Sequence, residues 1–402
     1  MRLEPEAMTS LKKRSRQGEE VFEVAPGRFF FATPESAALA NRINSKELSL
    51  PDTLVDTFLK KRSCPFSWKT LRKDWIQDLR EDTYAINIFN SMDKTLIRNV
   101  DSLSDMKRLT HELIMAPLIE VIFGDLDETT KLKILNFQKS NIETLSDKKT
   151  STNSLKFKVS SFLKNFRMTM VLRKEIKRRS RRISVPHHGL IDVVCRYLPS
   201  LKMERAVDAV STLLTATAGP PGAAATGLLY ELVRHPDLCQ RVEREMAQVD
   251  PRSLIDGNYD DVPFAHAFLK ESLRLWTVPF VFRNVRSDMA VCGQSLNEKE
   301  SFAASPYFIH TDPKYWSDPE VFDPNRWMNG NSINKDAYVP YGWAPRLCVG
   351  AALGERQLLL MLWLFTNRYS LEDVRTSEEI EFSAFQQPVS FTAIIKKRDQ
   401  TE

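Results

Sequence analysis

The segment from Tyr338 to Gly350 constrains this chain most, because it delivers one cysteine, Cys348, from a turn-rich loop into the start of an apolar helix. Gly342 and Gly350 flank the thiol, and glycine tolerates both a sharp turn and the close approach of a flat molecule. A helix that begins after the cysteine directs N–H groups and the positive end of its dipole toward the sulfur, which stabilises a thiolate. Arg346 adds a positive charge two residues away. A lone cysteine is usually an inert core residue, but this pattern predicts that Cys348 binds a metal as an anion.

The residues around Cys348 resemble the heme-binding loop of the cytochrome P-450 family. That loop contains an aromatic–glycine pair, an arginine two positions before the cysteine and a glycine two positions after it. The matching residues are Tyr341, Gly342, Arg346, Cys348 and Gly350. Tyr341 stands where the family usually has phenylalanine, and Ala344 stands where it usually has a second glycine. The resemblance implies that Cys348 is the axial ligand of a heme b, and that Gly342, Arg346 and Gly350 belong to the cofactor site.

Length and composition predict one large globular body. The 402 residues contain no linker rich in glycine, serine or proline that would divide them. Hydrophobic residues make up 42% and charged residues 27%, which excludes a disordered or membrane-spanning class. The resemblance implies a mainly helical fold with a small β-region and heme between a central helix and the helix after Cys348. We expect a single heme-thiolate domain over residues 1–402, with a small β-rich N-terminal part at about 18–35 and a helical body at about 36–402.

Charge, cysteine usage and hydropathy narrow the partners and the location. The net charge of +5 is spread along the chain, which argues against nucleic acid as a partner. The five cysteines are far apart and odd in number, so we expect no disulfide framework and a reducing compartment. We expect no transmembrane span, because no apolar stretch reaches about 18 residues. We expect a cytoplasmic protein, or one associated with the endoplasmic reticulum if an N-terminal anchor is missing from this chain; peripheral contact with a membrane fits either location.

Trp68 and Arg72 stand four residues apart, so a helix would place an indole N–H and a guanidinium group on one face. The cytochrome P-450 family has a Trp-x-x-x-Arg pair that binds a heme propionate, and the resemblance gives this role to Trp68 and Arg72. The alternative is a surface arginine beside a packed tryptophan. Trp75 and Arg80 form a competing pair a short distance along the chain.

The segment from Val278 to Arg283 is an apolar loop that leads into a strand. In the family, residues of this segment face the substrate while an arginine reaches a propionate. The resemblance therefore implies that Val278 and Phe280 line the substrate pocket and that Arg283 contacts the heme. His310 lies in a segment that fits the family's connecting region, where it donates either to a propionate or only to the backbone.

Glu271 and Arg274 lie three residues apart on one helical face, with apolar residues on both sides. A buried pair of this kind calls for a third partner, because an unpaired buried charge is costly. The family completes its Glu-x-x-Arg helix with an arginine downstream, and Arg326 matches that position. The resemblance implies that these three residues are structural and hold the loop that carries Cys348.

The segment 204–236 resembles the long helix that crosses the distal face of the heme in the family. The family's acid–threonine pair, which manages proton delivery, falls at Gly219 and Pro220, and neither residue can transfer a proton. Two glycines and two prolines within 219–222 predict a sharp kink. Thr217 is the nearest hydroxyl and is the catalytic candidate. The freed carbonyl groups offer a place for water or substrate, and the alternative is a broken helix without chemistry.

Two further segments complete the prediction. The run from Arg173 to Arg182 is strongly basic, which predicts a solvated helical face, and such a face would also suit an acidic electron donor. The residues after Gly350 predict an apolar helix. The segment from Phe382 to Ile394 predicts a closing hairpin whose tip could touch the substrate.

These elements leave two main classes of function open. In the first, the protein is a monooxygenase that oxidises an apolar small molecule of secondary-metabolite, lipid or terpenoid type with O2, using electrons that NADPH supplies through a reductase or a ferredoxin. In the second, it is a heme-thiolate enzyme that needs no oxygen activation, such as a peroxide-dependent enzyme, an isomerase or a dehydratase. The frequency of monooxygenases in the family favours the first, and Gly219–Pro220 favours the second. The intact loop around Cys348 argues against a non-catalytic heme binder.

Overall fold

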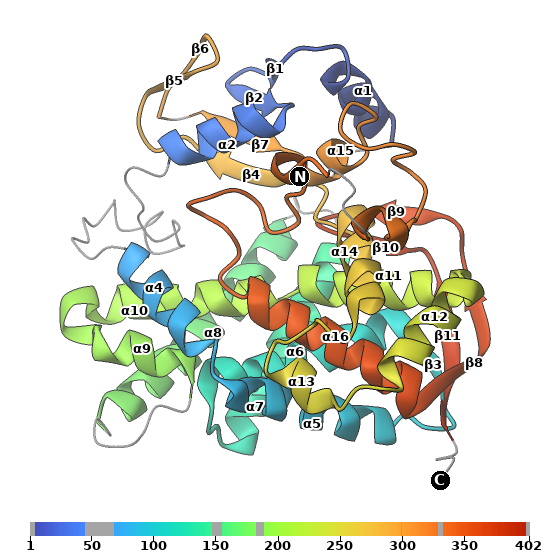
Figure 1. The fold of residues 1–402 in the computed structure, drawn as a ribbon. Coiled ribbons are helices and arrows are strands. Elements are labelled where there is room, and N and C mark those ends of the chain that lie inside the picture. The colour runs from blue at the N-terminus through green and yellow to red at the C-terminus, as the bar shows by residue number, and fades with distance from the viewer. Residues whose placement is uncertain are drawn as a thin grey trace.

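The computed structural model describes residues 5–44, 68–146, 155–181, 189–298, 300–328 and 333–398. A small β-rich region sits above a larger body of helices in Figure 1, and the two are linked by several crossings of the chain. The mainly helical fold with a small β-region that the sequence predicted is confirmed. Cys64 and the end of the basic run at Arg182 lie outside the described residues.

The β-rich region is built on a four-stranded sheet whose strands come from two distant parts of the chain. Its order is β1 (Val21–Ala25), β2 (Arg28–Phe31), β7 (Ser301–Ala304) and β4 (Val281–Asn284). β1 and β2 form a hairpin within the predicted β-rich N-terminal part, and Gly27 turns the chain there with a φ of +69°. β2 pairs with β7 in parallel, and β4 pairs with β7 antiparallel. The β-rich region therefore extends beyond the predicted range of about 18–35. The sequence near the hairpin could not predict this, because the parallel partner of β2 comes from residues 301–304.

Short helices and a second hairpin pack around this sheet. They are α1 (Pro5–Ser15), α2 (Pro34–Ile43), α15 (Pro306–His310), β5 (Met289–Val291) and β6 (Gln294–Leu296). Helix α2 begins at Pro34, because the Thr33 side chain accepts a hydrogen bond from the Ser36 N–H and Pro34 occupies the first turn. Phe29, Phe31 and Phe302 fill the core beneath the sheet.

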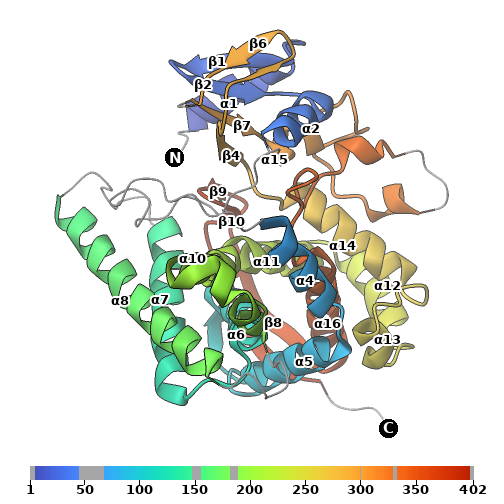
Figure 2. The ribbon, with the colours of Figure 1, turned by 90° about the vertical axis from the view of Figure 1, so that its left-hand side faces the viewer.

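The helical body surrounds a large buried core. Its helices are α4 (Trp68–Asp78), α5 (Asp82–Ile97), α6 (Met106–Phe123), α7 (Glu128–Ser146), α8 (Leu155–Ser180), α9 (Leu190–Arg196), α10 (Leu198–Thr217), α11 (Pro220–Arg234), α12 (Pro236–Met246), α13 (Pro251–Ile255), α14 (Pro263–Leu275) and α16 (Ala351–Asn367). Figure 2 shows α10 and α11 in the middle, with α7 and α8 on one side and α12, α13 and α16 on the other. The short 3-10 helices Pro324–Trp327 and Lys335–Ala337 lie between α15 and α16.

The C-terminal strands close the body on the far side of the central helices. β8 (Tyr369–Thr376) and β11 (Phe391–Lys397) form an antiparallel pair that β3 (Leu103–Asp105) extends. β9 (Ile380–Phe382) and β10 (Gln386–Pro388) form a separate short hairpin. The predicted hairpin over Phe382–Ile394 is thus divided between two sheets, and Phe385 at the tip of the β9–β10 hairpin lies against the central helix at Gly219.

The central helix is interrupted where the sequence predicted a kink. α10 ends at Thr217 and α11 begins at Pro220. Gly219 has a φ of +110°, a conformation that side-chain-bearing residues rarely adopt, and the two prolines that follow cannot donate to the helix before them. The break therefore follows from the local sequence alone.

Candidate active site

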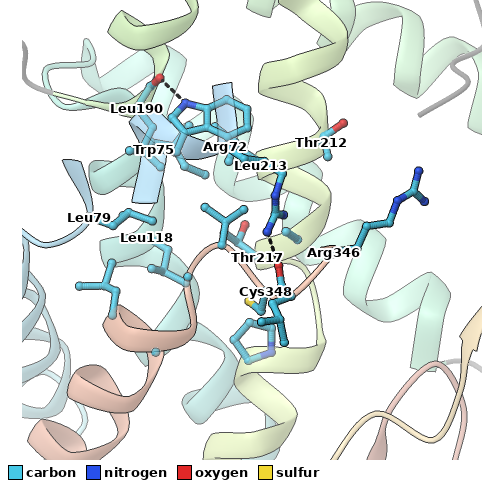
Figure 3. A pocket seen from close by; sticks show the side chains of 18 of the residues that line it. Arg72, Trp75, Leu79, Leu118, Leu190, Thr212, Leu213, Thr217, Arg346 and Cys348 are labelled. Carbon is cyan, nitrogen blue, oxygen red and sulfur yellow. Dashed lines mark hydrogen bonds between the residues drawn. The ribbon is translucent and has the colours of Figure 1, made fainter. Parts of the chain in front are cut away.

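A cavity of about 650 Å³ lies between the helical body and the loop that precedes α16 (Figure 3). Much of its wall is apolar. The apolar lining residues are Trp75, Leu79, Leu118, Val121, Ile122, Leu190, Leu213 and Leu353. In Figure 3, Leu79 and Leu118 lie on the side of the cavity away from Arg346, so the wall is apolar at one end and charged at the other.

Cys348 lines this cavity from the loop before α16. Its backbone N–H donates to the carbonyl oxygen of Tyr341 at 3.0 Å, which closes the loop on itself. The Tyr341 hydroxyl donates to Glu355 of α16 at 2.9 Å. The tyrosine that replaces the family's usual phenylalanine therefore ties the loop to the helix behind it.

Opposing effects act on the Cys348 thiol. Although its surface is open to the cavity, the protein packed around it raises the pKa of the thiol, whereas the Gly350 N–H and the charge of Arg72 lower it. Arg346, predicted as the neighbouring cation, points away from the sulfur in Figure 3. The cation that acts on the thiol is thus Arg72, which comes from α4.

Four guanidinium groups line the cavity, and they belong to Arg72, Arg283, Arg286 and Arg346. Burial, followed by the charges of the other three arginines, lowers the pKa of Arg346 to about 10. Burial also lowers the pKa of Arg283. Among the described residues, no aspartate or glutamate lines the cavity. Four cations gathered without a carboxylate favour an anionic ligand.

The structure separates the two Trp–Arg pairs that the sequence left in competition. Trp68 and Arg72 both line the cavity. Arg72 Nη2 also donates to the carbonyl oxygen of Leu347 at 2.6 Å, next to the cysteine. Trp75 instead donates its indole N–H to the carbonyl oxygen of Leu190 at 3.0 Å, and Arg80 does not line the cavity. The geometry therefore favours Trp68 and Arg72 as the pair that faces a ligand.

Glycines open the floor of the cavity beside the cysteine. Gly350 and Gly354 line it, and a Cβ added at either position would meet no atom within 4 Å. A flat molecule can therefore approach the backbone of the first turn of α16. A thiol, four guanidinium groups, an apolar wall and an open floor together fit a heme whose propionates are anionic. Gly342, predicted in the cofactor site, does not line the cavity; with a φ of +77° it serves the turn of the loop.

Glu271, Arg274 and Arg326 form the buried cluster that the sequence predicted. Arg274 binds Glu271 through two hydrogen bonds of 2.9 and 2.8 Å, and Arg326 Nε donates to Glu271 at 2.9 Å. The indole N–H of Trp327 donates to the second carboxylate oxygen at 2.9 Å. Both Glu271 and Arg274 are fully buried. Every charge in the cluster is thus paired, as burial requires.

His310 does not reach the cavity, so its predicted place in the cofactor site is wrong. Its Nδ1 lies 2.8 Å from the carbonyl oxygen of Arg274, and its Nε2 accepts from the Val339 N–H at 2.8 Å. Both ring nitrogens are therefore used by the backbone, which was the alternative that the sequence left open. Because Val339 belongs to the loop that carries Cys348, the contact links the Glu271 cluster to that loop through Arg274 and His310.

Val278 and Phe280, predicted to line the substrate pocket, do not line the cavity. Phe280 packs against Phe30 and Phe308 in a separate aromatic cluster. The next residues along β4, Phe282, Arg283 and Asn284, do line the cavity. The prediction chose the right segment but placed the lining residues too early in it. A sequence pattern of a loop followed by a strand does not indicate which residue is the first to line a cavity.

The break in the central helix also lies at the cavity, where Ala216, Thr217 and Pro221 line the wall. The Thr217 hydroxyl donates to the carbonyl oxygen of Leu214 at 2.9 Å and accepts from Gln138 Nε2 at 3.0 Å. Gln138 is fully buried and comes from α7. The hydroxyl that the sequence named as the catalytic candidate is therefore engaged by the protein itself.

The basic run on α8 differs from the prediction of a solvated face. Arg179 is buried and binds Glu175 at 2.7 Å and Asp192 at 3.0 Å. Arg178 also binds Glu175, at 2.6 Å. Part of the run is thus an ion network that joins α8 to α9, because Glu175 on α8 and Asp192 on α9 supply carboxylates to Arg179.

Sequence reasoning missed several residues of the site, and three of them affect its charge, its floor and the helix break. Arg286 lines the cavity three residues after Arg283, Gly354 extends the glycine floor by one helical turn, and Gln138 binds the end of α10. The spacing of Gly350 and Gly354 on one helical face was a usable signal. Gln138 had none, because its role depends on how α7 packs against α10.

Comparison with known proteins establishes the family. The model of the cytochrome P450 family matches residues 63–395. The chain belongs to the cytochrome P450 family, whose members bind heme b. Human cytochrome P450 3A7 is 30% identical over 157 residues, which cover 38% of this chain and 31% of that protein. Germacrene A hydroxylase of Helianthus annuus is 27% identical over 224 residues, covering 52% of this chain and 45% of that protein. The chain therefore matches less than half the length of these relatives.

Solved structures share the fold across nearly the whole chain. A zebrafish cytochrome P450 solved with progesterone is similar with a TM-score of 0.79 at 17% identity, over 99% of this chain and 100% of that chain. The heme domain of cytochrome P450DA is similar with a TM-score of 0.74 at 16% identity, over 98% of this chain and 93% of that chain. Within the described residues, no helix is long and apolar enough to cross a membrane.

Proposed function

We propose that this protein is a heme-thiolate monooxygenase that transfers one oxygen atom from O2 to an apolar small molecule. The observation that carries the proposal is that Cys348 and four arginines line one largely apolar cavity, in a chain of the cytochrome P450 family. Heme bound there would supply the oxygen and electron chemistry. The protein would supply an anionic sulfur ligand, charge for the propionates and a pocket that excludes water.

The proposed roles of the residues follow from their positions. Cys348 is the axial ligand, and Arg72 lowers the pKa of its thiol and so favours the thiolate that binds iron. Trp68 and the four arginines of the cavity bind the propionates. Gly350 lets the macrocycle approach the backbone. The Glu271 cluster and His310 act one step away, because they hold the loop of Cys348 without touching the cavity.

The substrate class and partners are the broader part of the proposal. We propose an apolar substrate of terpenoid, lipid or secondary-metabolite type, because the cavity wall opposite the arginines is apolar and because plant germacrene A hydroxylases are among the similar proteins. Electrons would come from NADPH through a reductase or a ferredoxin. We place the protein in the cytoplasm or on the surface of the endoplasmic reticulum.

One observation supports a second candidate, a heme-thiolate enzyme driven by peroxide or acting on an already oxygenated substrate. Among the described residues that line the cavity beside the helix break, none is an aspartate or glutamate, and the Thr217 hydroxyl is bonded to the protein on both sides. Proton delivery during oxygen activation would then have to come from water, from Thr217 after rearrangement, or from the substrate.

The test is made in two stages on the heme-loaded protein. A red-shifted Soret band in the reduced CO complex is the expected sign of thiolate ligation, and its absence from properly folded, heme-loaded protein would end the proposal. Product formed per NADPH with a reductase is then compared with product formed from hydrogen peroxide alone. Product that depends on NADPH and O2 supports the monooxygenase, whereas product from peroxide only supports the second candidate.

A further inference from the structure

The carbonyl groups at the end of α10 can be accounted for one by one. An α-helix leaves its last four carbonyls without donors inside the helix, and in α10 these belong to Leu214, Thr215, Ala216 and Thr217. The Leu214 oxygen accepts from Gln138 Nε2 at 2.6 Å and from the Thr217 hydroxyl at 2.9 Å. The Thr215 oxygen accepts from the Ala218 N–H at 3.2 Å. The carbonyl oxygens of Ala216 and Thr217 are the two that are left to account for.

Two prolines deprive these remaining carbonyls of their usual donors. A continuous helix would bring the N–H groups of residues 220 and 221 to the oxygens of Ala216 and Thr217, but Pro220 and Pro221 have no N–H. No other group in the described part of the chain donates to either oxygen. When a ligand displaces water from the cavity, any carbonyl that it leaves unpaired costs free energy, so a ligand that donates to these oxygens should bind more tightly than one that does not.

Both residues stand at the cavity wall. Ala216 and Thr217 line the cavity, as does Pro221 at the start of the next helix. Helical carbonyls point along the axis toward the C-terminus, where the helix dipole is negative. Leu213 on the preceding turn and Val121 and Ile122 on α6 make the surrounding wall apolar. The two carbonyl oxygens are therefore hydrogen-bond acceptors within a mainly apolar part of the cavity wall.

Side chains pack closely against the break from both sides. A Cβ at Gly219 would lie 2.6 Å from the Phe385 ring, and a Cβ at Gly222 would lie 2.3 Å from the His111 ring. Both rings belong to buried residues, at 1% and 6% exposure. Gly219 and Gly222 thus leave room for side chains of the β9–β10 tip and of α6 to pack against the break.

We propose that the carbonyl oxygens of Ala216 and Thr217 bind a hydroxyl or N–H group of an otherwise apolar substrate. The proposal rests on the proposed function, since it concerns the substrate of the same cavity. It narrows the substrate from any apolar molecule to an alcohol or amine with an apolar skeleton. A hydrocarbon or a ketone of the same shape offers no donor and leaves both oxygens unpaired.

The first experiment compares ligands of equal shape on the heme-loaded protein by isothermal titration calorimetry. The probes are borneol, camphor and bornane, and in parallel menthol, menthone and menthane. The alcohols should bind about tenfold more tightly than the ketones and hydrocarbons, as expected for about one good hydrogen bond. Equal affinities within each set, or no binding by any of the six, would overturn the proposal.

A variant then tests whether the preference for alcohols arises at the helix break. The double change Pro220→Ala and Pro221→Ala restores two N–H groups and should reduce the advantage of the alcohols to within about twofold. Pro236→Ala, at the first position of α12 and exposed, is the matched control and should keep the advantage. An unchanged alcohol preference in the double variant would speak against the site.

A crystal structure of the borneol complex keeps the test decisive if the double variant misfolds. The hydroxyl oxygen should lie within about 3.2 Å of the carbonyl oxygen of Ala216 or Thr217, and a hydroxyl bound elsewhere would refute the assignment. The CO spectrum of the same preparation distinguishes failure of the proposed function from failure of the proposed donor site. A missing thiolate band removes the proposed function, whereas a normal band with no alcohol preference removes only the donor site.

Discussion

The two sides of the cavity differ in how they are held. On the thiolate side, formed by the loop around Cys348 and the Glu271 cluster, buried charges and hydrogen bonds connect α14 to the loop through His310 and Val339. On the helix-break side, formed by the junction of α10 and α11, glycine and proline set the shape and Gln138 makes the main side-chain contact.

The difference shows that one cavity can combine a fixed half and an adaptable half. A buried charge network tolerates little change, since removing one partner leaves the others unpaired. A helix break made by glycine and proline removes hydrogen bonds without adding charges, so its chemistry can change at small cost in stability. We therefore expect substitutions to have large effects on the thiolate side and small ones at the break.

The largest effect is expected at the cysteine itself. Cys348→His should abolish the red-shifted Soret band of the reduced CO complex, because an imidazole replaces the thiolate. Cys292→Ser is the matched control, since Cys292 is exposed and does not line the cavity. If the band survives in Cys348→His, Cys348 is not the ligand, and the side of the cavity that carries it is not the thiolate side.

The Glu271 cluster should come next. Glu271→Ala leaves Arg274 fully buried with its carboxylate partner gone and should lower the free energy of unfolding by about 3–5 kcal/mol. Urea denaturation measures it, with heme content as a second readout. Glu378→Ala is the control: its side chain is 91% exposed, and it should change stability by less than about 0.5 kcal/mol. Full stability in Glu271→Ala would show that the thiolate side is not held by this cluster.

The link through His310 should appear as a dependence of stability on pH. Burial, aided by the charge of Arg274, lowers the pKa of His310 to about 3 from 6.5. Acid therefore favours the unfolded chain, where the ring binds a proton more readily. The stabilisation is fully present above about pH 6.5 and is lost as the pH falls toward 3, at up to about 1.4 kcal/mol per pH unit.

The variant His310→Gln isolates this contribution. Urea denaturation between pH 6 and pH 4 should give a shallower fall in stability for the variant than for the wild type, by up to about 1.4 kcal/mol per pH unit. Matching circular dichroism at pH 7 establishes that both proteins are folded. Parallel slopes would mean that the link from Arg274 to Val339 does not depend on a neutral imidazole.

The smallest effect is expected at the helix break. Thr217→Val removes a hydroxyl that already serves Leu214 and Gln138, so stability should fall by only about 1 kcal/mol. Product per NADPH should be low in the wild type, with peroxide released, and should change by less than about twofold in the variant. A large loss of product per NADPH in Thr217→Val would instead identify this hydroxyl as the proton donor. It would also show that the helix-break side tolerates substitution no better than the thiolate side.

The same comparison explains what the sequence could predict. The thiolate loop, the pair Glu271 and Arg274 and the kink at Gly219 were predictable from residue types at short spacing, whereas Arg326, 55 residues from Glu271, was predicted only through the resemblance to the family. The role of Trp68 and Arg72 was predicted from the resemblance and from a spacing of four residues, and packing decides that Arg72, and not Arg80, lines the cavity.

The failures share a physical cause, which is tertiary packing between distant segments. His310 was predicted at the cavity, yet its ring is used by the backbone of Arg274 and Val339. Phe280 was predicted in the pocket, yet it packs with Phe30 of β2, roughly 250 residues earlier. No local pattern encodes which of several apolar residues faces an empty space and which faces another part of the chain.

The parallel pairing of β2 with β7 has a consequence for synthesis in the cell. β2 leaves the ribosome roughly 250 residues before β4 and roughly 270 residues before β7, the strand that pairs with it. At about 5–20 residues per second, the edge carrying Phe29, Phe30 and Phe31 waits about 14–55 seconds for its partner. An unpaired apolar edge is a template for aggregation. The nascent chain should therefore depend on chaperones most strongly during the interval that precedes translation of residues 301–304.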